Sequence, residues 1–331
     1  MPPADVVVVG GGLAGVLAAE VLHARGHAVR VIDRAERRAS DAPCAIVHPF
    51  VGGSFAPRPN VEAAWGASRA WFLARASFVR EEVVRRHLPS TKPGDRLLAS
   101  WPKVEALARR MFAHVVPPSS DRFVEYGPVL AVDLQRLLAA ERTLQRARGV
   151  DWLEGEVVGL RCDGSSWRVS LIGGDSQTAS RVVVAAGVGA LPLLRRFADV
   201  GGLARAEGTL AWAHGDLDGP FLIHGGHASG AAGRLAWGAT YRMLEGDPRC
   251  PRRALAEIDA RLREVGAPLP RLQDAHRWTG TRLVDTQTRT PWVREHAPGL
   301  WSMCAFGSQG CLWGPWSARR LLAPKTETVA G

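Results

Sequence analysis

The chain of 331 residues has no long apolar run, and its few cysteines follow no regular spacing. No stretch approaches the roughly 20 apolar residues that span a bilayer, so we expect no membrane segment. An apolar run that leads into a glycine-rich segment begins near residue 5, which leaves no room for a signal peptide. The sequence therefore predicts a soluble, cytoplasmic protein. The cysteines form no C-x-x-C pair, which argues against a disulfide framework or a metal site: Cys44, Cys162, Cys250, Cys304 and Cys311.

Lysine is nearly absent. Only Lys92, Lys103 and Lys325 are lysines, so 39 arginines supply almost all of the positive charge, and the formal net charge is +10. A strong positive excess is typical of proteins that bind a polyanion such as RNA. The arginines form no run longer than a pair, and a nucleic-acid footprint needs clustering. Binding of nucleic acid and an even spread of charge therefore both stay open.

The N-terminal segment reads as strand, tight turn, helix and second strand. Residues 6–9 are all valine, residues 10–15 read Gly-Gly-Gly-Leu-Ala-Gly, and residues 28–32 form a second apolar run that ends at Asp33. Gly10 permits the tight turn, Gly12 lets backbone N–H groups approach a pyrophosphate, and Gly15 lets the helix lie close to the strand. Asp33 stands where a carboxylate accepts from a ribose hydroxyl. This order predicts dinucleotide binding.

The next elements do not follow a simple nicotinamide dehydrogenase, in which further helix–strand units come at once. Residues 40–53 are rich in loop-forming residues, and Asn60 is a candidate N-cap for an amphipathic helix that continues to about His87. Helical spacing returns over residues 132–149 and strand-like runs follow at 150–158. Residues 167–171 alternate as a half-buried strand, 173–175 form a hairpin turn, and 181–187 read as a buried strand that ends in small residues.

Taken together, these motifs resemble the FAD-dependent D-amino-acid oxidase and glycine oxidase superfamily. The likeness is greatest to glycine oxidase and to the flavin domain of the bifunctional enzyme that modifies the wobble uridine of tRNA. It rests on residues 10–33, 45–53, 157–158, 184–187, 238–241, 280–282 and 306–310. The resemblance implies an α/β fold with a Rossmann-like, glutathione-reductase-like FAD-binding domain, interleaved with a smaller α+β substrate domain that has a mostly antiparallel sheet. It places the FAD-binding domain in residues 1–85, 130–200 and 279–331, and the substrate domain in 86–129 and 201–278.

The resemblance also implies where FAD lies. The diphosphate would rest on the glycine turn, the adenosine on Asp33 and near Val157, and the flavin ring between Ala45 and the loop that opens the last helix. The positive end of that helix would face the flavin. No cysteine directly follows Arg282, so we expect non-covalent FAD. The cofactor-binding residues implied are Gly10, Gly12, Leu13, Ala14, Gly15, Asp33, Arg34, Ala45, Val157, Ala186, Gly187, Gly307, Ser308, Gln309 and Gly310.

Members of this superfamily oxidise a C–N bond by hydride transfer to flavin, with dioxygen or another acceptor taking the electrons. Arg282 stands where relatives clamp a substrate carboxylate through a bidentate pair. His48 is a candidate donor or base near the ring, or a histidine satisfied within its own turn, and Tyr241 either orients substrate or belongs to the core.

The chain departs from the glycine oxidase pattern, because Ser308 or Gln309 replaces a second arginine and Trp313 and Trp316 crowd the segment that follows. We therefore expect oxidation of an amino acid or an N-substituted, glycine-like amine, with free glycine a poor substrate. Oxidative removal of a carboxymethyl group from a wobble uridine of tRNA is one alternative. An FAD-binding accessory subunit without activity of its own is another.

Overall fold

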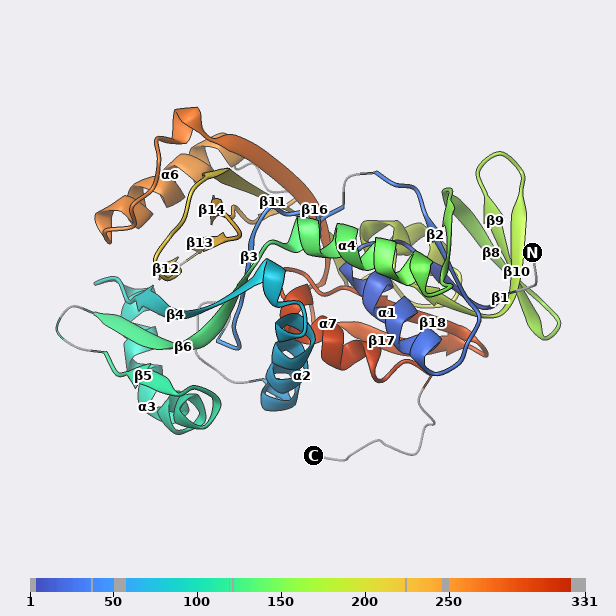
Figure 1. Cartoon of the computed structure of the whole chain (residues 1–331), viewed down its shortest axis with the longest axis horizontal. Helices are drawn as coiled ribbons and strands as arrows, with labels where there is room; N and C mark the ends of the chain where they lie inside the picture. Colours follow the sequence, from blue (N-terminus) through green and yellow to red (C-terminus); the bar gives the residue numbers. More distant parts are fainter. Residues whose placement is uncertain are drawn as a thin grey trace. The chain divides into compact units, whose positions relative to one another are not determined.

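The computed structural model of the chain describes residues 4–36, 38–50, 58–118, 120, 122–223, 225–245 and 250–322. The chain divides into two compact units, and each unit is built from segments that are far apart in the sequence. Unit 1 comprises Met1–Ser40, Leu138–Arg205 and Arg282–Gly331, and unit 2 comprises Asp41–Leu137 and Ala206–Thr281. Figure 1 shows their helices and strands and labels many of them.

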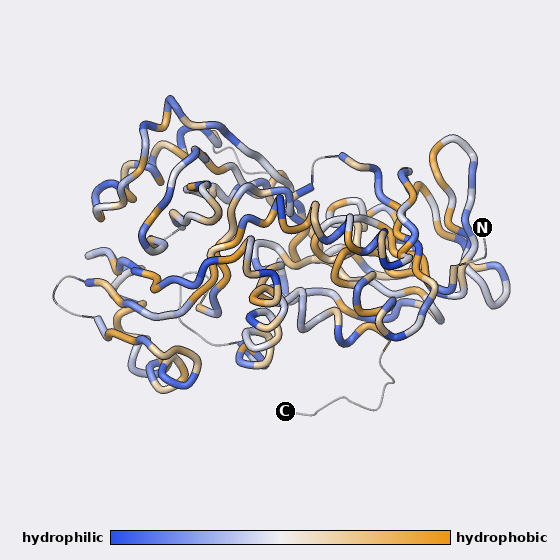
Figure 2. The backbone as a smooth tube through the Cα atoms, in the orientation of Figure 1, coloured by the Kyte–Doolittle hydropathy of each residue, from blue (hydrophilic) through white to orange (hydrophobic). Residues whose placement is uncertain are grey.

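Unit 1 is built on a mixed sheet with the strand order β17-β18-β10-β1-β2-β7. The neighbours from β18 to β7 pair in parallel, whereas β17 pairs with β18 antiparallel and β8, β9 and β10 form an antiparallel meander. The central strand β1 reads as a continuous valine run because it is buried on both faces. Figure 2 colours the backbone by hydropathy and shows hydrophobic stretches within the sheet of unit 1. The strands are β1 (Ala4–Val9), β2 (Val29–Asp33), β7 (Asp151–Glu154), β8 (Val157–Asp163), β9 (Ser166–Leu171), β10 (Ser176–Val184), β17 (Trp292–Ala297) and β18 (Leu300–Cys304).

Two helices of unit 1, α1 (Leu13–Ala24) and α7 (Gly310–Ala318), lie side by side and run in the same direction (Figure 1). A Cβ built on Gly310 would lie 3.7 Å from the side chain of Leu13, so their N-termini are neighbours. At their other ends the Arg25 guanidinium donates to the carbonyl oxygens of Arg319, at 2.6 Å, and Leu321. The remaining helical segments of this unit are η2 (Gly187–Gly189) and α5 (Ala190–Leu194). Helix α4 (Leu134–Ala147) begins in unit 2 and continues into unit 1.

Unit 2 is built on a second, mostly antiparallel sheet with the order β15-β11-β14-β13-β12-β4-β6-β3, to which β16 and β5 add at β11 and β6. Helix α6 packs Leu255, Ile258 and Leu262 into an apolar cluster against this sheet. The strands are β3 (Ala45–Val47), β4 (Val79–His87), β5 (His114–Val116), β6 (Phe123–Val132), β11 (Leu203–His214), β12 (Phe221–Ile223), β13 (Gly226–Ala231), β14 (Arg234–Gly238), β15 (Arg242–Met243) and β16 (His276–Asp285). The first residues of β11 and the last residues of β16 belong to unit 1. The helical segments are α2 (Val61–Leu73), η1 (Ala76–Phe78), α3 (Lys92–Met111), α6 (Pro251–Glu264) and η3 (Leu272–Asp274).

The α/β fold class predicted from the sequence is confirmed, with a parallel-sheet unit and a mostly antiparallel one. The long helix expected up to His87 is wrong, because α2 ends at Leu73 and β4 pairs with β6 along its whole length. Asn60 precedes α2 with a φ of 63° and makes no side-chain cap.

Residues 41–85 are predicted in the FAD-binding domain, yet β3 and β4 belong to the sheet of unit 2. The roles of the two domains stay a prediction. Residues 51–53 of the 45–53 motif lie outside the described residues. None of the described helices is long and apolar enough to cross a membrane.

Candidate cofactor site

The glycine turn between β1 and α1 is shaped by close backbone contacts. Gly10 has a φ of 103°, and a Cβ at this position would lie 2.7 Å from the carbonyl oxygen of Ala185 and the Cα of Ala186. A Cβ on Gly15 would lie 1.8 Å from the carbonyl oxygen of Gly10. A Cβ on Gly12 would meet no backbone, only the Ser40 hydroxyl at 3.0 Å and the Arg38 side chain at 3.9 Å. The first two glycines are therefore required by contacts with neighbouring backbone, whereas at Gly12 only the side chains of Ser40 and Arg38 lie nearby.

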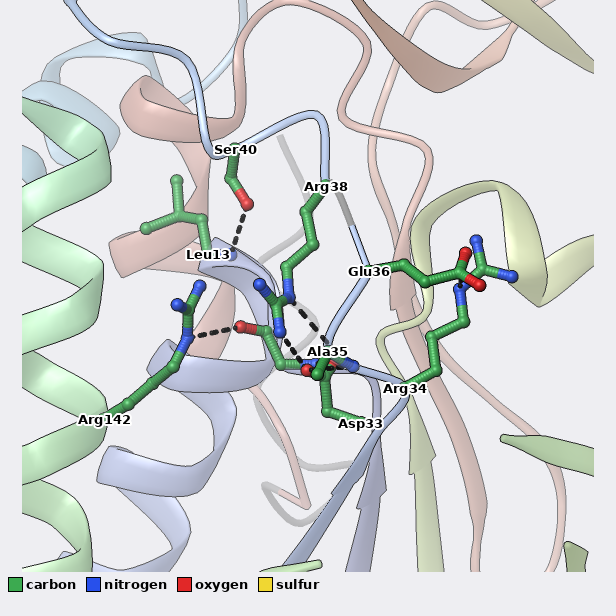
Figure 3. A network of polar contacts seen from close by, with 9 residues as sticks. Leu13, Asp33, Arg34, Ala35, Glu36, Arg38, Ser40 and Arg142 are labelled. Atoms are coloured by element: carbon green, nitrogen blue, oxygen red, sulfur yellow. Dashed lines mark hydrogen bonds and ion pairs between the residues drawn. The ribbon is translucent and has the colours of Figure 1, made fainter. Parts of the chain in front are cut away.

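Asp33, at the end of β2, is bound to that turn (Figure 3). Its Oδ1 accepts the N–H of Gly11 at 2.8 Å and Nε of Arg38 at 3.4 Å, and its Oδ2 accepts the N–H of Ala35 at 3.2 Å and a terminal nitrogen of Arg38. Burial raises the pKa of the Asp33 carboxyl, but the Arg38 guanidinium and the Gly11 N–H outweigh burial and hold the pKa below its usual value. A carboxylate offers about four acceptor positions, so a ribose hydroxyl at Asp33 must displace or share one of these donors.

The segment after β2 also reaches the start of α1. The backbone N–H of Leu13 donates to the Ser40 hydroxyl at 3.1 Å (Figure 3). Helix α1 has no side-chain cap from its own N-cap residue, Gly12, and no acidic residue in its first turn. Sequence reasoning missed Arg38 and Ser40, because the dinucleotide pattern marks only the glycines and the acid.

The other predicted cofactor stretches follow neighbouring strands of the same sheet. Parallel strands bring their carboxyl ends to one edge, and Val9 lies opposite Val184 and Ile32 in register. Ser302 lies opposite Val184 on the other side of β10. Residues 305–310 follow β18, 185–187 follow β10, and 10–15 follow β1. Asp33 is the last residue of β2, and 155–157 follow β7. The carboxyl edge of a parallel sheet is where open α/β folds bind their ligands.

The loop that opens α7 contacts the end of β16. The N–H of Gly307 donates to the carbonyl oxygen of Leu283 at 2.9 Å, and Phe306 forms an isolated bridge with Val284. Arg282, half-buried and directly before Leu283, is therefore held beside this loop within unit 1. Asp285 rigidifies the following turn, since it accepts the N–H groups of residues 287 and 288 and the indole of residue 292.

Gln309 is held by the helix that it precedes. Its Oε1 accepts the indole N–H of Trp313 at 2.9 Å, and the Trp313 ring packs edge-on against Trp316 with ring centroids 5.7 Å apart. Trp313 thus holds the side chain of Gln309, and Trp316 packs against Trp313. Because Gln309 is the N-cap of α7 and Trp313 follows four residues later, their spacing in the sequence is compatible with this contact.

His48 and Tyr241 belong to unit 2, so the structure describes them apart from the cofactor stretches of unit 1. His48 is buried, and its Nδ1 lies 3.2 Å from the hydroxyl of Tyr126. Burial, with the charges of Arg86 and His227, lowers the pKa of His48 to about 3, and burial raises the pKa of Tyr126 to about 12. The partner of His48 is thus Tyr126 of β6 and not a group of its own turn. Its catalytic role stays a prediction.

Three further residues that are predicted to bind the cofactor lie in three different elements or loops. Val157 begins β8 and pairs with Leu171, Ala45 begins β3 in unit 2, and Arg34 forms ion pairs with Glu36 at 3.2 Å and Glu156 at 3.7 Å. Their contacts with FAD stay predictions.

Three comparisons bear on this arrangement. A family model described as FAD dependent oxidoreductase matches residues 5–323. A curated relative is 28% identical over 342 residues and is named tRNA 5-methylaminomethyl-2-thiouridine biosynthesis bifunctional protein MnmC, from Caulobacter vibrioides. The match covers 97% of this chain but 54% of that protein, so the chain spans about half the length of this relative.

Two solved structures share the fold at low identity. Glycine oxidase from Bacillus cereus has a TM-score of 0.76 and 20% identity, with 96% of this chain and 93% of that chain covered. Iminodiacetate oxidase from Chelativorans sp. has a TM-score of 0.76 and 19% identity, with 95% and 93% covered.

The residues present fit FAD. At Gly12 a Cβ would meet only side chains and no backbone, the first turn of α1 carries no acid, and the predicted contacts of unit 1 lie along one edge of its sheet. These are the features by which a dinucleotide diphosphate is bound.

Proposed function

Because the chain belongs to the family of FAD dependent oxidoreductases, we propose that it oxidises the C–N bond of an amino acid or of an N-substituted, glycine-like amine. FAD would supply the acceptor for a hydride, that is for two electrons and one proton, in such a reaction. The protein's own task is to bind the substrate, to orient the carbon that loses hydride and to exclude competing chemistry. Water then hydrolyses the imine that is left on the substrate.

The position of Arg282 is the observation that carries this proposal. The carbonyl oxygen of its neighbour Leu283 accepts the N–H of Gly307, so the backbone at Arg282 lies beside the loop that opens α7. A planar guanidinium binds a carboxylate through two parallel hydrogen bonds and thereby fixes its orientation as well as its place. An amine one carbon away from that carboxylate would be held in a defined position.

The loop itself favours a substituted amine over free glycine. Ser308 or Gln309 stands where glycine oxidase has a second arginine, and the side-chain Oε1 of Gln309 accepts the Trp313 indole N–H. A single cationic clamp binds a small amino acid weakly, so additional contact with an N-substituent would be needed for tight binding. Iminodiacetate, after which one structural neighbour is named, is such an N-substituted glycine.

Anaerobic mixing of the flavin-loaded protein with a panel of amines tests this proposal. Sarcosine, iminodiacetate and other N-alkylglycines should bleach the flavin absorbance faster than glycine does. Readmission of dioxygen then reports whether dioxygen is the electron acceptor. If no amine of the panel reduces the flavin while dithionite does, the chain is not an autonomous amine oxidase, and the accessory-subunit alternative is favoured.

A tRNA-linked reaction is the second candidate, and the likeness to the MnmC protein over 97% of this chain favours it. A carboxymethylaminomethyl group on a uridine is chemically an N-alkylglycine, so the same clamp would serve. Binding to unmodified and modified tRNA should then be measured across salt concentrations. A steep loss of affinity with salt supports a polyanion footprint, and absence of binding at low salt removes this candidate.

A further inference from the structure

The glycine turn is anchored from two directions, and one anchor comes from a distant helix. Asp33 accepts the N–H of Gly11 at 2.8 Å, and Nε of Arg142 donates to the carbonyl oxygen of Gly11 at 3.1 Å. Figure 3 shows Arg142 approaching the turn from α4, on the side away from Arg38. The amide and the carbonyl of one glycine are thus both held by side chains.

The second of these bonds fixes the direction of a different group. The carbonyl of Gly11 and the N–H of Gly12 belong to one planar, trans peptide unit, in which they point in opposite directions. A bond that holds the carbonyl therefore aims the N–H. Consecutive glycines have the greatest freedom to rotate such a unit, because no Cβ restricts their backbone dihedrals. Without an anchor, the Gly12 N–H would sample several directions.

The part of α4 from which Arg142 extends is itself held in place. One helical turn later, Nε2 of Gln145 donates to the carbonyl oxygen of Val16 in α1 at 2.8 Å, and Gln145 is buried. Arg146, next on α4, places its guanidinium 5.2 Å from the centre of the Trp152 ring in β7. Helix α4 is therefore anchored on both α1 and the sheet of unit 1 around the position from which Arg142 extends.

We propose that Arg142 is a positioning residue for the cofactor diphosphate, which acts through the carbonyl of Gly11 to aim the N–H of Gly12. The inference rests on FAD as the cofactor. It does not depend on which amine is oxidised, so it stands or falls separately from the proposed substrate.

The chain length of arginine permits a matched set of variants. Nε2 of glutamine and Cε of methionine are as many bonds from Cα as Nε of arginine is. Arg142→Gln therefore keeps a donor at that place and removes the charge, whereas Arg142→Met removes both and keeps the length. Gln145→Met removes a comparable bond between α4 and α1 that does not involve the turn, and serves as the control for helix packing.

Dissociation constants for FAD and for ADP should be measured on the full-length protein stripped of flavin, with adenosine as a ligand that lacks the diphosphate. Arg142→Met should weaken FAD and ADP by about tenfold or more, as expected for one charge-assisted hydrogen bond, and leave adenosine unchanged. Arg142→Gln should stay within about threefold of the unmodified protein, since the donor is restored. Thermal unfolding of each stripped protein reports on folding.

Three results would overturn the inference. Wild-type ADP affinity in Arg142→Met would show that the Gly11 bond is not needed. Equal losses in Arg142→Gln and Arg142→Met would show that the charge acts directly on the ligand. Equal losses in Gln145→Met and Arg142→Met, with adenosine also weakened, would assign the effect to packing of α4.

Discussion

A methyl group at Gly15 provides the most direct test of the cofactor turn. Gly15→Ala would place its Cβ 1.8 Å from the carbonyl oxygen of Gly10, whereas ordinary contact begins at 3.4 Å. The obstacle is backbone, so no side-chain rotation relieves the clash. Helix α1 must withdraw from β1 by roughly 1.5 Å, or the turn must change its conformation.

Either response damages the site by an amount that can be estimated. Overpacking of this kind typically costs about 1–3 kcal/mol of the free energy of unfolding. A shift of roughly 1.5 Å also carries the Gly11 N–H out of hydrogen-bonding range of Asp33, because such bonds weaken steeply beyond about 3.2 Å. With the turn no longer presenting its N–H groups together, we expect FAD affinity to fall about 100-fold, or close to 2.7 kcal/mol.

Gly66→Ala is the matched control. Gly66 is exposed within α2, and a Cβ there meets nothing within 4 Å. That variant should gain up to about 1 kcal/mol from helix propensity and bind FAD normally. Flavin fluorescence titration gives the affinity, and urea unfolding gives the stability. Wild-type FAD affinity together with wild-type stability in Gly15→Ala would refute the requirement for close approach.

Three further predictions concern charged groups. Arg282→Lys should lower kcat/KM for a carboxylate substrate by roughly 10- to 100-fold at unchanged FAD content, because the bidentate geometry is lost, and equal turnover would contradict the clamp. The pKa of Asp33 is lowered in the folded state, so its stabilisation is present above the ordinary value of 3.8 and is lost as pH falls through the folded value. Asp33→Asn should accordingly lose less stability than the unmodified protein between about pH 5 and 3, as measured by urea unfolding. Folding lowers the pKa of His48 from 6.5 to about 3, so as pH falls the unfolded chain takes up a proton before the folded protein does. At pH 5 this lowers the free energy of unfolding by about 2 kcal/mol relative to neutral pH. In His48→Gln this pH-dependent loss should be absent.

The sequence was most informative where structure is local. The valine run, the glycine turn and the acid at the end of the second strand all lie within the first 33 residues, and their order alone predicts the dinucleotide-binding unit. Residues 79–87 show the limit of local reasoning. Their spacing suits a helix, yet β6 offers a partner along the whole segment, and pairing within a sheet outweighs a weak local preference.

Contacts that join distant segments could not be predicted from one sequence. Arg38, Ser40 and Arg142 reach the glycine turn from positions that no spacing rule connects to it. Their residue types are also those expected on any solvated surface. The Gln309–Trp313 hydrogen bond is a local contact, because its partners are four residues apart at the start of one helix. That spacing could be recognised in the sequence.

The parallel packing of α1 and α7 explains why these particular stretches are free of acid. Each helix contributes about half a positive charge at its N-terminus, and the two N-termini lie together, as the 3.7 Å approach between Gly310 and Leu13 shows. An acidic side chain in either first turn would be stabilised there and would compete with an anionic ligand, yet neither turn contains one. The Leu13 N–H instead meets the neutral Ser40 hydroxyl, which a phosphate oxygen can replace without leaving a buried charge behind. The N-terminal ends of both helices can therefore stabilise the negative charge of a bound cofactor diphosphate. The Asp33 carboxylate nearby does not compete, because it is paired with Arg38.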